Sequence, residues 1–523
     1  MSIVSIAPAG SLGILKDSSP AELPPTAWSD GKNVQFIQGQ VVSAPDAVSI
    51  YPATPIPFNT AIATPVASDS QATWLLAGAA KIYAYTSNIL TDVSRAVGGA
   101  YTGGADTRWT GGVLGGVGFL NNGVDLPQAW LTADPLVKVI DLANWPSNTS
   151  ARCLRSYKQY LVALDITKAG VRKPTLVKWS HPADPGTVPI SWNETDPTKD
   201  AGEYPLSETA GSCIDCLPLR DVNLIYKQDS VWGMQYVGGT YVFRFYKVFG
   251  DFGVPQKDCV VEYVSGRHFV FTGNDMLVHD GQTVTSVASG KIQKLFKTLS
   301  AQQLQTCYVA LSSISKEVWV CLRLASDSTI AADTAVTYNW ESGAISLRTL
   351  PDYVFVANGR LDPPVSNTVT WETALSPWNA HAEMWGEAIA VPSQMRMLGI
   401  TASELYWVDA LAISTVYCWV ERLHQGVPVR AGRPPDLSAQ KFLTRIWPRF
   451  TGRTGDTVTI TLGASDSVAF PPVWEMEQQF RIGIDAYLDC TITGKLFSIR
   501  LESVNTAQWT YAGMDAEVIA SGN

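Results

Sequence analysis

The residues of this chain that are best suited to chemistry are Cys213 and Cys216, which form a lone C-x-x-C motif. Such a pair can supply two ligands of a zinc ion or form a redox couple. Zinc needs two further ligands at a suitable spacing, and the nearest candidates, His181 and Cys259, form no second paired motif. We therefore expect two plain thiols here, and the sequence predicts neither a metal site nor any other cofactor.

The histidines and carboxylates do not form a recognisable catalytic set. His279 stands before Asp280-Gly281, where we expect a turn residue, and the other histidines are scattered, at positions 181, 268, 381 and 424. No Gly-x-Ser-x-Gly elbow, phosphate-binding loop or His-Glu-x-x-His zinc motif occurs in the sequence. A carboxylate pair for glycan hydrolysis cannot be chosen from spacing. We expect that the protein is not an enzyme, with a hydrolase of cell-envelope polymers as an alternative.

A glycine-rich stretch contains Gly111-Gly112 and Gly115-Gly116-x-Gly118, but it lacks the spacing of a dinucleotide-binding loop. Glycine tolerates the positive φ angles of tight turns at little cost. The stretch therefore predicts a turn-rich hairpin.

Three arginines, Arg445, Arg449 and Arg453, lie four residues apart around Ile446-Trp447-Pro448. Pro448 and Gly452 exclude a regular helix. We expect an ordinary surface loop at this place. The alternative is a contact between subunits through Arg445, Trp447 and Arg449, because Arg and Trp are enriched at the hot spots of interfaces.

Length, composition and charge indicate a globular, multidomain β-protein. The 523 residues predict two to four domains, and the hydrophobic fraction of 46% is enough for their cores. The 18 Trp and 19 Tyr side chains favour half-buried sheet surfaces. A net charge of −9 excludes a broadly basic surface that grips nucleic acid. An acidic surface still lets DNA pass alongside without adhering.

The sequence contains no pattern of a targeting or membrane-spanning segment. The first basic residue is Lys16, so no charged region precedes an apolar stretch as in a signal peptide. The uncharged run between Asp409 and Glu421 is shorter than the ~20 residues of a membrane helix. We expect synthesis in a cytoplasm and no crossing of a bilayer. The eight cysteines are sparsely spaced, which predicts buried free thiols.

The largest region, residues 61–360, repeats short alternating strands between polar turns, as in Trp74-Leu75-Leu76-Ala77-Gly78 and Lys81-Ile82-Tyr83-Ala84-Tyr85. Turn signals at intervals of about 8–12 residues are typical of sandwiches, barrels and propellers. The strands group into units of about 40–50 residues, which is the length of a propeller blade. We therefore predict a mainly β fold, in which a β-propeller is joined to a β-rich platform domain.

One helix is predicted within the propeller region. Residues 291–304 place apolar side chains at helical spacing, at Ile292, Leu295, Phe296 and Leu299. We expect this helix to pack on a blade edge, and a nucleic-acid contact through its lysines is the less favoured alternative.

The remaining regions are predicted as an arm and two platform segments. Residues 1–60 form an N-terminal arm, in which a proline-containing segment precedes a hairpin with Gly39 in its turn. Residues 361–439 form a connecting platform region after a proline-rich boundary at 361–380. Residues 440–523 form a C-terminal β-domain, because segments such as Thr457–Leu462 alternate cleanly.

The arm carries a resemblance to a known family. The segment Glu22-Leu23-Pro24-Pro25-Thr26-Ala27-Trp28-Ser29-Asp30-Gly31-Lys32-Asn33-Val34-Gln35-Phe36, followed by Gly39, resembles the start of the tail nozzle proteins of short-tailed bacteriophages. These are the tail tubular protein B and packaged-DNA-stabilising virion proteins. Looser similarities are at Val177–Ser180 with Ile190–Trp192, Ile225–Lys227 with Ser230–Trp232, and Gly494–Ser503 with Trp509, Gly513 and Glu517.

The resemblance implies a structural protein of the virion tail. It implies a propeller joined to a β-rich platform, with the arm and the C-terminal region on the same side. It also implies a ring of six copies around the DNA exit channel, below an adaptor ring, that retains the genome until infection. Tail fibres or spikes and the host envelope are further partners that it suggests. Six copies would carry a charge of 6 × −9 = −54, so DNA would slide through such a channel without specific binding.

Docking of the arm is the site that follows from this resemblance. A pre-extended proline segment loses little entropy on docking, so Pro24 and Pro25 favour it. Leu23 and Trp28 are the expected apolar anchors, and Asp30 begins an expected Asp-Gly turn. Docking on a neighbouring subunit and folding back on the arm's own domain are both open. A tail propeller that binds a host receptor or a glycan is the alternative function.

Overall fold

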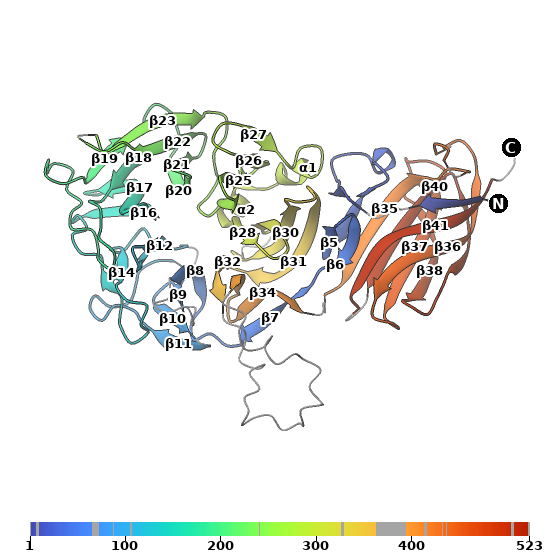
Figure 1. The fold of residues 1–523 in the computed structure, drawn as a ribbon, viewed down its shortest axis with the longest axis horizontal. Coiled ribbons are helices and arrows are strands. Elements are labelled where there is room, and N and C mark those ends of the chain that lie inside the picture. Colours follow the sequence, from blue (N-terminus) through green and yellow to red (C-terminus); the bar gives the residue numbers. More distant parts are fainter. Residues whose placement is uncertain are drawn as a thin grey trace, which may run out of the picture.

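The computed structural model of the chain describes residues 2–6, 10–64, 73–86, 88–104, 107–239, 241–325, 329–361, 394–412, 416–430, 432–435, 437–503 and 507–520. The described residues form a β-propeller and a β-sandwich, which we call the platform, lying side by side (Figure 1). The mainly β architecture predicted from the sequence is therefore confirmed.

The propeller has seven four-stranded antiparallel blades among the described residues. Blades 1 to 3 consist of β8 (Phe58–Thr64), β9 (Thr73–Gly78), β10 (Ile82–Thr86) and β11 (Ile89–Asp92); β12 (Thr110–Leu114), β13 (Val117–Asn121), β14 (Gln128–Trp130) and β15 (Ile140–Asp141); and β16 (Thr149–Tyr157), β17 (Tyr160–Lys168), β18 (Val171–Trp179) and β19 (Gly202–Pro205).

Blades 4 to 6 follow in chain order. They consist of β20 (Cys213–Leu219), β21 (Val222–Lys227), β22 (Val231–Tyr236) and β23 (Phe243–Phe249); β24 (Val260–Val264), β25 (Arg267–Phe271), β26 (Met276–His279) and β27 (Val284–Ser286); and β28 (Tyr308–Ser312), β29 (Glu317–Leu322), β30 (Ala332–Asn339) and β31 (Ile345–Tyr353).

Blade 7 closes the ring with a strand from the N-terminal part of the chain. Its order is β32 (Phe355–Leu361), β33 (Gln394–Ile400), β34 (Leu405–Ala412) and β7 (Asp46–Tyr51). β7 pairs antiparallel with β34, and the innermost strands β32 and β8 are in contact. Because β7 precedes blade 1 in the sequence, this pairing joins the first and last blades.

Burial explains why the blade strands have these sequences. Each blade packs against two neighbours, so both faces of its middle strands lie in a core and all residues of β9 and β29 are buried. Such strands are continuous apolar runs instead of alternating ones. Gly115 and Gly116, with φ angles of 55° and 91°, form the turn between β12 and β13, so the predicted glycine-rich hairpin is confirmed.

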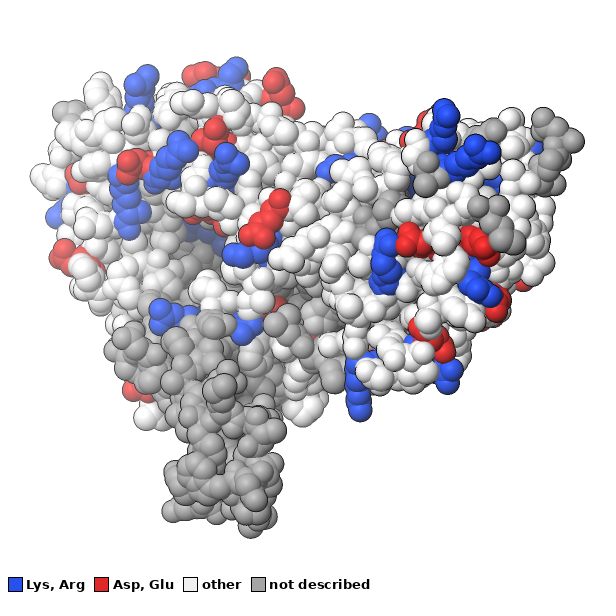
Figure 2. Space-filling model, turned by 45° about the vertical axis from the view of Figure 1, so that its right-hand side comes forward, with Lys and Arg blue, Asp and Glu red and all other residues white. Residues whose placement is uncertain are grey.

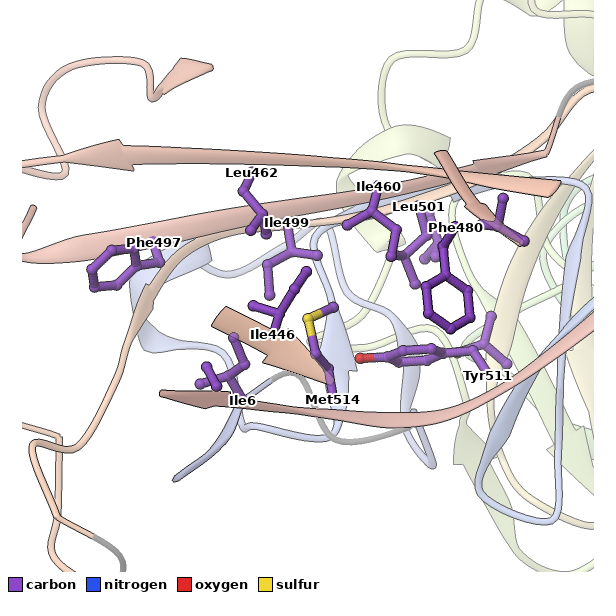
Figure 3. Close-up of a cluster of buried hydrophobic side chains, with 14 of the residues drawn as sticks. Ile6, Ile446, Ile460, Leu462, Phe480, Phe497, Ile499, Leu501, Tyr511 and Met514 are labelled. Atoms are coloured by element: carbon purple, nitrogen blue, oxygen red, sulfur yellow. The ribbon is translucent and has the colours of Figure 1, made fainter. Parts of the chain in front are cut away.

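The platform consists of two sheets packed face to face. One contains β39 (Leu488–Gly494), β36 (Lys441–Gly452), β41 (Trp509–Ala520), β6 (Gln40–Ser43) and β5 (Val34–Ile37), with β1 (Ser2–Ile6) also paired to β41; the other contains β38 (Val473–Arg481), β37 (Thr457–Ser465), β40 (Leu496–Ser503), β35 (Cys418–Gly426) and β4 (Asp30–Lys32). Apolar side chains of both sheets meet between them, as Figure 3 shows for Ile446, Tyr511, Ile460 and Leu501.

The N-terminal arm takes part in both domains. Its β5–β6 hairpin, with Gly39 in the turn, is confirmed. β2 (Gly13–Ile14) and β3 (Ala27–Trp28) extend the outer edge of blade 6 in parallel, and η1 (Pro20–Glu22) lies between them in the chain. β1, β4, β5 and β6 pair with platform strands, so the arm ties the two domains together.

Two of the predicted domain boundaries are wrong. The propeller does not end at residue 360, because β33 and β34 complete blade 7, and the region predicted as 361–439 is divided between that blade and the platform strand β35. The arm does not extend to residue 60, because β7 already belongs to the propeller. The proline-rich boundary of that prediction, at 361–380, lies outside the described residues apart from Leu361. β36 to β41 fall within the predicted 440–523 domain.

The single helix predicted over residues 291–304 is two short helices, α1 (Gln293–Phe296) and α2 (Ala301–Thr306). The break has a local cause: Ser300 starts α2 with a capping box, in which its hydroxyl accepts from the Gln303 N–H and the Gln303 side chain accepts from the Ser300 N–H. In the part of the chain that the structure describes, no helix has the length and apolar character needed to cross a membrane.

The packing of Trp28 generates a stability prediction. Its side chain is 1% exposed and meets the Tyr511 ring edge-on at 5.9 Å between centroids. Trp28→Ala removes a core indole, so we expect a loss of about 3–5 kcal/mol in the free energy of unfolding, measured by denaturant titration of the purified protein. Trp474→Ala is the matched control, because Trp474 is 39% exposed and should cost well under 1 kcal/mol. Equal losses of stability at the two positions would contradict the placement of Trp28 in the core.

Candidate functional site

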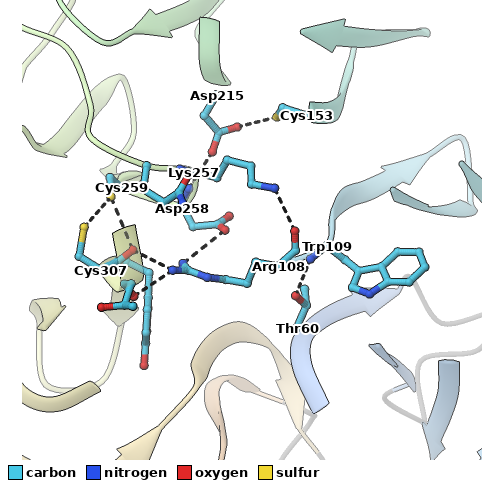
Figure 4. A network of polar contacts seen from close by, with 12 residues as sticks. Thr60, Arg108, Trp109, Cys153, Asp215, Lys257, Asp258, Cys259 and Cys307 are labelled. Atoms are coloured by element: carbon cyan, nitrogen blue, oxygen red, sulfur yellow. Dashed lines mark hydrogen bonds and ion pairs between the residues drawn. The ribbon is translucent and has the colours of Figure 1, made fainter. Parts of the chain in front are cut away.

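A buried ionic network joins the blades around the propeller axis (Figure 4). Arg155 of β16 in blade 3 donates through Nε and Nη2 to the Asp215 carboxylate of β20 in blade 4, both at 2.8 Å. Its Nη2 also donates to Asp258, just before β24 of blade 5, at 2.7 Å. Burial opposes ionisation of Asp215, but Arg155 and the hydrogen bonds outweigh it, so the pKa of Asp215 lies below its ordinary value.

Arg108 carries this network across the axis. It precedes β12 of blade 2, and its Nη2 donates to the carbonyl oxygens of Thr306 and Cys307, which precede blade 6, at 2.9 and 3.1 Å. Its guanidinium also lies 5.2 Å from the ring centroid of Tyr308 and 5.7 Å from that of Phe355, in blades 6 and 7. One side chain thus connects blades on opposite sides, and the axis is bridged by direct contacts.

The network explains ring closure better than it explains catalysis. Asp215 and Arg108 are both buried, and Lys257 donates to the backbone carbonyl of Arg108 at 2.9 Å. These groups are held by one another and by backbone oxygens from several blades. The sequence does show charged side chains on the innermost strands, such as Arg155 and Asp215. It does not show which of them form ion pairs, because the two partners lie in different blades.

Two histidines, His268 and His279, meet Tyr226 at the interface of blades 4 and 5. The Tyr226 hydroxyl lies 2.7 Å from His268 Nδ1 and 2.9 Å from His279 Nε2. His268 Nε2 lies 2.9 Å from the Pro218 carbonyl and must donate to it, so its Nδ1 accepts from Tyr226. The Tyr226 oxygen then accepts from His279 Nε2–H, and His279 Nδ1 accepts from the Gly281 N–H. This chain of bonds requires both imidazoles to be neutral.

The prediction that His279 is a turn residue is wrong. It is the last residue of β26 and is buried, with Phe249 against its ring at 5.3 Å between centroids. Burial is the main reason that the pKa values of His268 and His279 are both lowered to about 4.

The thiols of the C-x-x-C motif lie within β20. Cys213 and Cys216 are buried, and burial raises the pKa of each thiol to about 12. A thiol that stays protonated is a poor nucleophile and a poor metal ligand. All eight cysteines are buried and free, as predicted. Among the described residues, no three His, Cys, Asp or Glu side chains are grouped as metal ligands.

The residues predicted to dock the arm lie in a segment that we call the strap, residues 10–26, and in the strands that follow it. Leu23 is buried in a small cluster with Leu15 and Ala27, while Pro24 and Pro25 are exposed. Trp28 is in the platform core. Within this chain the arm packs on its own domains, and docking on a neighbouring subunit stays a prediction.

Asp30 is not in a turn. It pairs with Glu421 as part of β4 on the edge of the platform, and its carboxylate makes an ion pair with Lys16 at 2.7 Å. Next to Lys16, the Asp17 carboxylate accepts from the backbone N–H groups of Gln293 and Lys294 at 2.9 Å, which caps α1 of the propeller. The strap is thus fixed to both domains.

The predicted surface loop at Arg445 to Arg453 is wrong for most of its length, because β36 continues to Gly452. Arg445, Trp447 and Arg449 alternate along the outer face of this strand, while Ile446 and Pro448 face the core. Arg445 makes an ion pair with Asp489 at 2.8 Å, and Arg449 makes one with Asp515 at 2.7 Å. The three side chains therefore share one face.

Arg453 is separate from this face. It lies at the rim of a groove of about 570 Å³ between the arm hairpin and the platform, with Asp456, Gln35 and Trp509 among the lining residues. The structure brings Arg445, Trp447 and Arg449 together, and it places Arg453 elsewhere.

No family model matches the sequence, and no curated protein is similar to it. Many solved structures are similar in part to this chain, among them the following three. They are a streptogramin B lyase (TM-score 0.36, 8% identity, 59% of this chain and 89% of the lyase), PorZ, a surface component of the type-IX secretion system of Porphyromonas gingivalis (0.32, 6%, 58% and 34%), and a functionally unknown protein from Desulfotomaculum acetoxidans (0.31, 10%, 55% and 84%). At these scores the similarity carries no argument about function.

The ionic network predicts a large effect of Arg155 on stability. Arg155→Ala leaves the Asp215 carboxylate, 2% exposed, without its ion-pair partner, so we expect a loss of about 3–5 kcal/mol in unfolding free energy. Arg481→Ala, which removes a surface ion pair with Asp485, should cost far less, because water screens exposed ion pairs. Calorimetry of both variants measures the difference in stability. An Arg155 variant as stable as the Arg481 variant would rule out a stabilising role of the network.

The histidine pair predicts acid lability. Because the pKa of each imidazole is about 4 when folded and about 6.5 when unfolded, the unfolded chain binds more protons below pH 6.5. Stability should therefore fall as the pH drops from about 6.5 to about 4, by up to about 1.4 kcal/mol per pH unit for each histidine. Denaturant titrations of the wild type and of a His268→Gln, His279→Gln variant measure this slope, which should be smaller in the variant.

Proposed function

We propose that this chain is a structural subunit of the tail nozzle of a short-tailed bacteriophage. In this role, copies of it form the distal tail tube around the DNA exit channel, retain the genome and let it pass at infection. The proposal assigns no catalytic step to the chain. It places the protein in the virion tail after synthesis in the host cytoplasm.

The observation that carries the proposal is the sharing of one platform sheet by the arm and the C-terminal strand. β1 pairs with β41 from Ser2↔Val518 to Ile6↔Met514, and the β5–β6 hairpin extends the same sheet. A propeller joined to a β-rich platform, with the arm and the C-terminal region on one side, is the arrangement that the resemblance of the arm implies.

Contacts at the propeller axis limit where DNA could pass. Contacts of Arg108 and Arg155 bridge the axis between blades, so a duplex has no path through the propeller of one subunit. The channel must then lie between subunits of a ring. Figure 2 shows one face of the molecule on which charges of both signs are interspersed among large uncharged areas. A surface of this kind supports passage of DNA without tight binding.

The outer face of β36 is the proposed contact between subunits. It presents Arg445, Trp447 and Arg449 side by side, and interface hot spots are enriched in Trp and Arg. The remaining partners follow from the role: an adaptor ring above, tail fibres or spikes at the side, and the host envelope below.

A second candidate function is favoured by one observation. The propeller exposes tyrosines at blades 3 and 4: Tyr241 is 80% exposed, and Tyr204 stacks on Phe245 with ring centroids 4.7 Å apart. Exposed aromatic rings with neighbouring polar groups suit a glycan or a receptor. In that case the protein is a host-binding tail propeller.

Light scattering combined with negative-stain electron microscopy tests the proposal, with the protein run by itself and with candidate adaptor rings. Six-fold rings with a central opening, formed by the chain itself or only on the adaptor, are the expected result. A monomer or trimer that ignores the adaptor and binds host cells would favour the second function instead.

Two single variants separate the two functions. Trp447→Ala should raise the protein concentration needed for ring formation about tenfold, because losing a hot-spot side chain costs more than about 1 kcal/mol of association. Tyr241→Ala, on the far domain, should leave ring formation unchanged. If only the Tyr241 variant has a defect, and the defect is in binding to cells, the nozzle assignment fails.

A further inference from the structure

The platform has an exposed apolar hairpin tip at its end away from the propeller. The tip connects β37 to β38, and we define it as residues 466–474. From Val468 to Trp474 every side chain is apolar, and those of Phe470 and Val468 are 69% and 54% exposed. The pairings of β37 with β40, and of β36 with β39 and β41, place the tip at the end of the platform that carries both chain termini (Figure 1). A cluster of exposed apolar side chains of this kind marks a surface that contacts another molecule.

The backbone of the tip has few hydrogen-bond donors left for a partner. The Ala469 N–H donates to the Ser467 hydroxyl at 3.2 Å, and the Phe470 N–H donates to the Ser467 carbonyl at 3.5 Å. Pro471 and Pro472 have no N–H group. A chain that pairs with another chain by strand addition uses such donors, whereas hydrocarbon penalises each donor that is unsatisfied. The tip therefore suits a lipid surface better than strand pairing with a protein.

The base of the tip is fixed, so its apolar side chains are held exposed before any partner binds. The Asp466 carboxylate accepts from Gln440 Nε2 at 2.9 Å. On the other side of the tip, the Trp474 ring lies beside Gly463 of β37, where a Cβ atom would come within 3.0 Å of the ring. The two successive prolines restrict the backbone between these anchors. Because the tip is already ordered, its insertion into a partner costs little conformational entropy.

Two cations flank the tip on a neighbouring loop, residues 427–440, which follows β35. This loop is tied to the tip by the bond between Gln440 and Asp466. Its Arg430 and Arg433 side chains are exposed. Among the described residues of the loop and the tip, these two arginines and Asp466 are the charged side chains, so the arginines outnumber the carboxylate. Exposed apolar side chains with cations beside them are attracted to anionic lipid headgroups.

We propose that the hairpin tip inserts into the surface of an anionic lipid bilayer, where Arg430 and Arg433 contact the lipid phosphates. Phe470 enters the boundary between the headgroups and the acyl chains, which is the depth that exposed apolar segments of a surface-bound protein reach. Glu475 and Glu477, which are exposed on β38 behind the tip, limit the depth, because carboxylates stay in water. The tip thus lies on the membrane surface and does not cross it.

This inference rests on the proposed nozzle function, in which the host envelope is a partner, and it assigns the contact with the envelope to the far end of the platform. A single tip buries only a few side chains, so one subunit binds a membrane weakly. Six copies in a ring would present six tips to the same membrane, and their combined binding is far stronger than that of one tip.

Co-sedimentation of the purified protein with vesicles tests the insertion. The wild type should bind vesicles of mixed phosphatidylglycerol and phosphatidylcholine, and it should bind pure phosphatidylcholine vesicles more weakly, because the arginines lose their anionic partners. The Val468→Ser, Phe470→Ser variant should bind the mixed vesicles about tenfold more weakly with an unchanged melting temperature, since both side chains are exposed. Ile484→Ser is the matched control. It changes a 54% exposed side chain beyond the other end of β38 and should bind as the wild type does.

A second variant tests the contact with the headgroups. Arg430→Gln, Arg433→Gln should weaken binding to the mixed vesicles about tenfold at low salt and much less at high salt, because salt screens the attraction. A wild type that does not bind the mixed vesicles would overturn the proposal, and so would a Val468→Ser, Phe470→Ser variant that binds them as the wild type does. If that variant binds vesicles normally but no longer forms rings, the tip is a contact between subunits instead.

Failure of this inference and failure of the nozzle function give different results. A wild-type chain that forms rings but does not bind the mixed vesicles would overturn the membrane contact and leave the nozzle function standing. A wild-type chain that binds the vesicles through the tip but never forms rings, by itself or on an adaptor, would contradict the nozzle function and support the membrane contact.

Discussion

An unpaired strand edge exposes a row of backbone N–H and C=O groups, and the architecture of this chain depends on how such edges are closed. A propeller blade needs neighbours on both sides, and a sandwich needs its outer strands covered. The N-terminal arm meets both needs. It extends the edge of blade 6 and contributes strands to both platform sheets, and the strand that follows it in the chain, β7, is the outer strand of blade 7. Without the arm, β31, β41 and β35 would each lose a pairing partner.

The polar interior of the propeller follows from the same geometry. Seven innermost strands converge on an axis, where side chains from opposite blades come within reach of one another. Arg155 and Arg108 fill this space with charge-assisted hydrogen bonds to carboxylates and backbone carbonyls. Apolar side chains could fill the same volume, but an arginine can also satisfy the carbonyl oxygens at the ends of segments such as Thr306-Cys307. The contacts of Arg155 and Arg108 thus hold the ring of blades closed.

Some local patterns in the sequence predicted local structure correctly. The β5–β6 hairpin and the turn at Gly115 and Gly116 follow from short-range rules, because strand alternation and glycine spacing are encoded within a few residues. The fold class followed from the repetition of such units. The burial of the cysteines followed from their apolar neighbours, as at Cys321 in β29.

Features that depend on distant residues could not be predicted in the same way. The pairing of β7 with β34 joins segments more than 350 residues apart, so the end of the propeller was placed too early. The meeting of Tyr226, His268 and His279 requires two blades to pack in a particular register.

The closure of blade 7 has a consequence for how the molecule is made. β7 leaves the ribosome early, but its partner β34 is synthesised only after six other blades. During that interval β7 has no partner strand. Long-range strand pairing of this kind is slow and open to misassembly. A chain that ends within blade 6 therefore cannot close the ring, and its arm lacks the C-terminal strands with which it pairs in the platform.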